Sequence, residues 1–123
     1  MRALFVESRE FTEWVAEFLP DDTYAALQQV LMDQPDKGNV MAGCGGLRKV
    51  RIADPKRGQG KRGGARVIYL YVAEAKWFFM LDIYGKDEKD DLSPAEKKSL
   101  AKLVDELKRQ ARAALRRTSR RKP

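Results

Sequence analysis

The most constraining feature of this sequence is the stretch from Gly45 to Val72, in which two short strand-like segments flank a basic, glycine-rich loop. Residues 47–53 and 65–72 are rich in β-branched and aromatic side chains, which favours strands. The segment between them, DPKRGQGKRGG, is too polar and too rich in turn residues to be buried. The stretch therefore predicts two paired strands joined by a long cationic loop.

Basic side chains concentrate in this predicted hairpin. From Arg48 to Arg66 there are eight lysines and arginines and a single acid, Asp54. Successive side chains of a strand point to opposite faces, so Lys49 and Arg51 share one face while Arg48 belongs to the other. We therefore expect one face of a sheet to carry cations.

Composition limits the class of protein. A chain of 123 residues with 43% hydrophobic content supports one domain with a modest core. Its 25 basic and 18 acidic residues, a net charge of +7, favour a polyanionic partner, either a nucleic acid or an acidic protein. Neither an apolar signal region nor a run of the ~20 apolar residues that cross a bilayer is visible. We therefore expect a cytoplasmic protein with no membrane partner.

The chain contains no histidine and one cysteine, Cys44. These counts exclude Ser-His-Asp and Cys-His nucleophiles, histidine-ligated metal sites and an internal disulfide. Cys44 is interpreted as a small residue of a glycine-rich turn. The loop before residue 65 is not a nucleotide-binding phosphate loop, because Arg62 follows Lys61 and a strand follows the loop. Any catalysis must therefore use lysine, arginine, tyrosine or carboxylate groups.

Helical periodicity precedes these strands. After a first strand over residues 2–7, Ser8 is predicted to cap a helix. The apolar stripe of this helix repeats every three to four residues, at Phe11, Trp14, Val15 and Phe18. Asp21 or Asp22 caps a second helix, which ends before Pro35. The N-terminal part therefore predicts a strand followed by a helical hairpin.

The later part of the chain predicts a third strand of the sheet and a last helix. Residues 77–84, WFFMLDIY, form a nearly all-apolar central strand, and Ser93, Pro94 and Glu96 form a capping box that begins a helix. Short connections make the last three strands antiparallel. The fold class is therefore α+β, with an N-terminal strand and helical hairpin, a small antiparallel sheet with one face covered by helices, and a C-terminal helix.

The C-terminal end is strongly basic. From Lys108 to Lys122 there are eight basic residues and no acid. We expect one domain over residues 1–107, followed by a basic helix end and tail over residues 108–123. This segment is either a solvated tail or a surface that binds RNA or an acidic partner.

Asp82 interrupts the apolar strand 77–84. A buried carboxylate normally needs a cationic partner, for which Arg66 and Arg51 on neighbouring strands are the candidates. A position near the edge of the sheet is the alternative interpretation.

Side chains able to cleave RNA converge if the sheet forms. Attack by the adjacent 2′-hydroxyl needs a base for its proton, positive charge for the phosphorane and an acid for the leaving 5′-oxygen. The candidates form three groups: Lys49 and Arg51 on one strand, Lys61, Arg62 and Arg66 around the next, and Tyr84 with Lys86 at the end of the last. A basic binding face without catalysis is the alternative that composition favours.

Three segments in this order, GGLRKVR (45–51), GKRGGARVIYLY (60–71) and IYGKDEKDDLS (83–93), together resemble the HigB-type toxins of bacterial type II toxin–antitoxin systems. These toxins belong to the RelE/ParE superfamily, and the resemblance runs from about residue 2 to residue 107. It implies a RelE-like fold and a ribosome-dependent endoribonuclease that cuts mRNA and arrests translation. It also implies a cognate HigA-like helix-turn-helix antitoxin, through which alone the toxin would meet operator DNA. No metal or organic cofactor is implied.

The resemblance also implies residue roles. Lys49, Arg51 and Arg66 would contact the scissile phosphate, with Lys49 as the leading general base and the two arginines stabilising the phosphorane. Tyr84 or Lys86 is our own candidate, in place of groups of the family pattern that this sequence lacks, to protonate the leaving group or stack on a base. The cations expected to bind the rest of the RNA are Arg48, Lys56, Arg57, Lys61 and Arg62.

The sequence departs from the RelE pattern at two positions. Asp87 stands where RelE-type toxins have an arginine, and Ser93 where they have a later tyrosine. ParE-type members of the superfamily inhibit DNA gyrase without cutting RNA, so a non-catalytic gyrase inhibitor is the alternative function.

Overall fold

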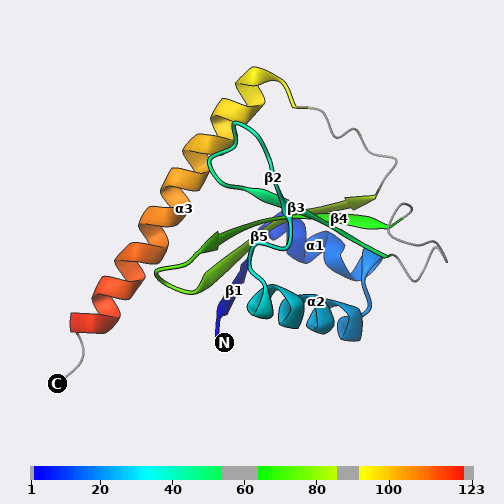
Figure 1. Ribbon diagram of the computed structural model, residues 1–123, viewed down its shortest axis with the longest axis horizontal. Helices are drawn as coiled ribbons and strands as arrows, with labels where there is room; N and C mark the ends of the chain where they lie inside the picture. The colour runs from blue at the N-terminus through cyan, green and yellow to red at the C-terminus, as the bar shows by residue number, and fades with distance from the viewer. Residues whose placement is uncertain (1, 54–63, 86–91, 121–123) are drawn as a thin grey trace.

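The computed structural model describes residues 2–53, 64–85 and 92–120 (Figure 1). The elements are β1 (Leu4–Glu7), α1 (Arg9–Phe18), α2 (Asp21–Asp33), β2 (Asn39–Val40), β3 (Arg48–Ile52), β4 (Ala65–Val72), β5 (Trp77–Gly85) and α3 (Pro94–Arg120). They confirm the expected α+β order and add a two-residue strand, β2, that the sequence did not predict. None of the described helices combines the length and apolarity needed to cross a bilayer.

The five strands form one sheet in the order β1-β5-β4-β3-β2. The last three strands, β3 to β5, are antiparallel as expected, β2 continues this pattern, and β1 runs parallel to β5. The parallel pair follows from topology, since α1 and α2 begin a long crossover between β1 and the rest of the sheet. The nearly all-apolar β5 is therefore an interior strand.

Helices pack on both faces of this sheet, rather than on one as predicted (Figure 1). On the first face, Phe11 of α1 and Leu27 and Leu31 of α2 are buried against the strands. On the second face, α3 buries one stripe of side chains, including Val104 and Ala111. The prediction missed this arrangement because helical periodicity identifies the apolar side of a helix and not the sheet face that it covers.

The predicted helix caps are confirmed at two of three positions. Ser8 Oγ accepts a hydrogen bond from the backbone N–H of Phe11 at 3.0 Å. Ser93 and Glu96 form the reciprocal capping box, with backbone-to-side-chain distances of 2.9 and 3.1 Å. The helix α2 instead begins after Pro20 without a side-chain cap. Asp21 and Asp22 lie in its first turn, where their negative charge interacts favourably with the positive end of the helix dipole.

Tyr69 connects the β2 region to the sheet. Its hydroxyl donates to the carbonyl of Pro35 at 2.7 Å and accepts from the N–H of Gly38 at 3.0 Å. A side chain at position 38 would clash, because a Cβ there would lie 2.9 Å from the Tyr69 ring. These contacts order the connection between α2 and β3. Nearby, Cys44 is a buried free cysteine within the turn region, as interpreted from the sequence.

Candidate functional site

Two rows of side chains cross the sheet face on the α3 side. In the first row, Arg51 of β3 pairs with Arg66 of β4, which pairs with Tyr84 of β5. In the second row, two residues further along each strand, Lys49 pairs with Ile68, which pairs with Asp82. Neighbouring strands lie about 4.8 Å apart, so each row spans about 10 Å across three strands. The convergence of Lys49, Arg51, Arg66 and Tyr84 that the sequence predicted is therefore present in the fold.

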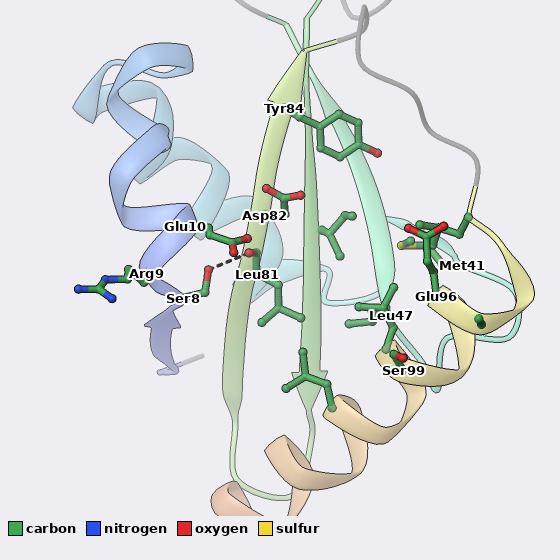
Figure 2. A pocket seen from close by; sticks show the side chains of 15 residues that line it. Ser8, Arg9, Glu10, Met41, Leu47, Leu81, Asp82, Tyr84, Glu96 and Ser99 are labelled. Atoms are coloured by element: carbon green, nitrogen blue, oxygen red, sulfur yellow. Dashed lines mark hydrogen bonds between the residues drawn. The ribbon is translucent and has the colours of Figure 1, made fainter.

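A β-bulge in β5 brings Asp82 and Tyr84 to this face. Met80 pairs with Tyr69 while Asp82 pairs with Ile68, so Leu81 is an extra residue on β5. Without this insertion, Asp82 and Tyr84 would follow Met80 into the core beneath α1 and α2. Figure 2 shows both side chains on the same side of β5 instead.

Ser8 holds the bulge in place. Its Oγ donates to the carbonyl of Leu81 at 2.7 Å while accepting from the N–H of Phe11. Its own N–H donates to the carbonyl of Met80 at 2.9 Å. The sequence indicated the capping role of Ser8, but no sequence signal indicated its bond to a strand 73 residues away. The start of α1 is therefore tied directly to the strand that carries Tyr84.

The site residues differ in exposure. Arg51 is exposed, Lys49 and Arg66 are half-buried, and Tyr84 is only 8% exposed. Arg66 Nη1 donates to the carbonyl of Gly64 at 2.9 Å, which orients its guanidinium at the start of β4. A phosphate group approaching this face would therefore meet two arginines and a lysine at its surface, with the tyrosine ring set deeper.

Asp82 is half-buried, and one carboxylate oxygen accepts the N–H of Ile83 at 2.9 Å. The pairing of β1 with β5 ends at Met80, so Asp82 lies beyond it and pairs only with Ile68 of β4. This agrees with the alternative of a position near the edge of the sheet. Of the two arginines suggested as its partner, Arg66 is on the adjacent strand, whereas Arg51 is two strands away. The register thus places Asp82 diagonally opposite Arg66.

Arg48 is separated from the other cations. It lies on the opposite face of β3, where its Nη1 donates to the carbonyls of Gly38 at 2.8 Å and Asp36 at 3.3 Å. Its contribution in the structure is to fix the connection before β2. The remaining site residues from the sequence lie outside the described residues: Lys56, Arg57, Lys61, Arg62 and Lys86.

Two hollows adjoin on this side of the sheet. The larger, about 700 Å³, extends from the start of α1 to the first turns of α3 and includes Asp82 and Tyr84 (Figure 2). The smaller, about 470 Å³, includes Lys49 and Arg51. Met41 and Leu92 line both hollows, so the two are neighbours. Neither hollow was predictable from the sequence, because both depend on where α3 crosses the sheet.

The chemistry available here is that of fixed cations and a phenol. Three cationic side chains can bind and polarise a phosphate group, and the phenol can donate or accept a proton. Within residues 2–53, 64–85 and 92–120, no three side chains of the kinds that commonly bind metals come together. The side chains described thus support acid–base and electrostatic chemistry on a phosphate.

Residues 8–122 match the family model of the RelE toxin of the RelE/RelB toxin–antitoxin system. The chain belongs to the RelE toxin family. Among solved structures, this RelE-family chain is similar to a double mutant of the E. coli toxin RelE in the free state. The two are 20% identical, with a TM-score of 0.48, over 82% of this chain and 95% of that one.

Membership of this family makes the chain the toxin of a toxin–antitoxin pair, with an antitoxin as its partner. The matched region continues past residue 107, as does the helix α3. A division of the chain between residues 107 and 108 therefore stays a prediction.

Proposed function

We propose that this RelE-family toxin is a ribosome-dependent endoribonuclease that cleaves mRNA during translation. The observation that carries the proposal is the row of Arg51, Arg66 and Tyr84 beside Lys49 on one accessible face. The bulge in β5 supports it further, because bulges often redirect side chains at functional sites. The proposed substrate, mRNA on the ribosome, also puts the site of action in the cytoplasm.

The proposed reaction uses the substrate's own 2′-hydroxyl as the nucleophile. Lys49 accepts the 2′ proton as the 2′-oxygen bonds to phosphorus, and the bond from phosphorus to the 5′-oxygen breaks. Arg51 and Arg66 stabilise the charge of the phosphorane, and Tyr84 or Lys86 gives a proton to the leaving oxygen. The products are a 2′,3′-cyclic phosphate and a 5′-hydroxyl. This mechanism needs no metal ion.

We further propose that the toxin is of the HigB type, with a HigA-like helix-turn-helix antitoxin. The support is the set of three segments, 45–51, 60–71 and 83–93, that resembles HigB-type toxins. Co-expression with the neighbouring open reading frame tests this proposal. A small helix-turn-helix protein that copurifies with the toxin and restores growth is expected, and a neighbour of another class that does both would contradict it.

Arg66→Ala tests the proposed site. We expect this change to reduce growth arrest and translation inhibition by about 10²- to 10³-fold, because it removes charge directed at the transition state. Inhibition of translation by the purified protein is the measurement, with circular dichroism as the check on folding. Arg2→Ala is the matched control, since Arg2 is exposed outside both hollows. Full toxicity of a folded Arg66→Ala protein would contradict the assignment.

A further inference from the structure

The cationic side chains that line the smaller hollow come from two elements, β3 and α3. Lys49 and Arg51 contribute from β3, Asn39 from β2, and Lys97 from the second turn of α3. No carboxylate is among the described residues that line it. Its volume of about 470 Å³ falls within the ~300–1,000 Å³ of sites that bind small ligands. The hollow is therefore suited to an anionic group.

Lys97 is positioned by packing. Its side chain is half-buried, and its stem crosses the turn at Gly43, where an added Cβ would lie 3.4 Å from Lys97 Cδ. Its backbone N–H donates to the carbonyl of Ser93 at 3.0 Å, within the helix start that the capping box fixes. Among the described residues, no side chain forms an ion pair with Lys97. The stem of Lys97 is thus held against the turn at Gly43, while the residue lines the smaller hollow.

The position of this hollow indicates what it binds. It shares Lys49 and Arg51 with the proposed reactive face and adjoins the larger hollow at Met41 and Leu92. Arg51, which lines the smaller hollow, pairs with Arg66 across β3 and β4. A polyanion with one phosphate at Arg66 can therefore place a neighbouring phosphate in that hollow. Lysine suits such a phosphate because its ammonium is a compact point charge that tolerates several approach directions.

We propose that the α3 side of this hollow, at Lys97, binds a phosphate of the RNA chain next to the scissile phosphate that Lys49 and Arg51 contact. Lys97 is its positioning residue. This inference rests on the proposed function, since it concerns the substrate of the same face. It adds a residue of α3 to a site that otherwise comes from the sheet.

Binding of a 2′-O-methyl hexaribonucleotide tests the inference, because this probe cannot be cleaved by 2′-hydroxyl attack. Fluorescence anisotropy at several salt concentrations compares the native chain with Lys97→Gln and Lys98→Gln. Lys98 is an exposed lysine that does not line the hollow. We expect Lys97→Gln to weaken binding about three- to tenfold and to reduce the salt slope by about 0.7, as loss of one phosphate contact requires. Lys98→Gln should change neither value.

A neutral methylphosphonate, moved along the probe one linkage at a time, identifies the phosphate concerned. At one linkage next to the scissile position, the native chain should lose affinity while Lys97→Gln shows no further loss. Lys97→Arg should restore the sensitivity, since it restores the charge. Equal sensitivity of the native and Lys97→Gln proteins at every linkage would overturn the inference.

Ribosome-dependent cleavage by the same proteins separates this inference from the proposed function. Cleavage with KM raised by Lys97→Gln and kcat little changed supports both. If only Lys97→Gln loses probe binding and the native chain does not cleave mRNA, the phosphate site is retained and the nuclease is rejected. If the native chain cleaves mRNA, and Lys97→Gln and Lys98→Gln do not differ in probe binding or cleavage, the nuclease is retained and the site is rejected. A native chain that binds an acidic peptide in place of the probe would also reject the site.

Discussion

The two arginines of β3 have different roles because a strand alternates its side chains. Arg51 faces the α3 side beside Arg66, whereas Arg48 faces the other side and donates to the carbonyls of Gly38 and Asp36. Local charge density therefore overstates the number of cations available to one ligand. The pattern of alternation predicted this division, while the carbonyl partners of Arg48 emerged only from the fold.

Two tyrosines should make the stability of the fold depend on alkaline pH. Burial raises the pKa of Tyr69 above its ordinary value of 10.0, and burial with the nearby Glu7 carboxylate raises the pKa of Tyr24. Because the folded pKa values exceed the unfolded ones, their contribution to stability is complete below pH 10 and is lost as the pH rises above it.

Urea unfolding between pH 8 and pH 11 measures this effect. The Tyr24 hydroxyl donates to Glu7 at 2.8 Å, and Tyr24→Phe removes the titrating group. We expect the unfolding free energy of the native chain to fall more steeply above pH 10 than that of Tyr24→Phe. Parallel curves for the two proteins would contradict the assigned direction of the Tyr24 shift.

At the scale of elements, the bulge in β5 determines which side chains reach the site. Ser8, at the start of α1, donates hydrogen bonds to two consecutive carbonyls at the bulge. Its backbone N–H donates to Met80 and its hydroxyl to Leu81. A capping residue of one element thus stabilises the irregular register of another. The start of α1 thus supports the strand that carries Asp82 and Tyr84, although α1 itself contributes no proposed reactive group.

Ser8→Ala tests that connection. It removes the cap of α1 and leaves the Leu81 carbonyl without its side-chain donor, so we expect a loss of about 1–3 kcal/mol in unfolding free energy. Ser99→Ala is the control, because Ser99 is exposed on α3 and lines the same hollow. Its effect should stay within about 0.5 kcal/mol. Equal stabilities of the two variants in urea unfolding would refute the double role of Ser8.

The elements could be predicted from sequence to different degrees. The strand over Ala65–Val72 and the helix after Ser93 were predicted with their observed starts, because strand composition and a capping box are local signals. The bulge was not predictable, since WFFMLDIY is apolar on both faces and its alternation therefore carries little information on register. β2 was also missed, because its two residues form a strand only by pairing with β3.

At the scale of the whole molecule, three helices surround the sheet unequally. The helices α1 and α2 cover one face, while α3 crosses the other and extends beyond it (Figure 1). The part of the second face near Tyr84 is left as the larger hollow. The fold class and the side chains of this face followed from sequence patterns and family resemblance. The hollows did not, because they depend on the packing position of α3.

The proposed nuclease activity requires that this face cut mRNA on the ribosome. The most direct measurement is mapping of the 5′ ends of a defined mRNA after incubation with the purified chain, with and without translating ribosomes. We predict new ends inside codons only during translation, and none with Arg66→Ala. Absence of new ends with the native chain, under conditions where it arrests growth or binds ribosomes, would contradict the nuclease and assign the toxin to inhibition by binding.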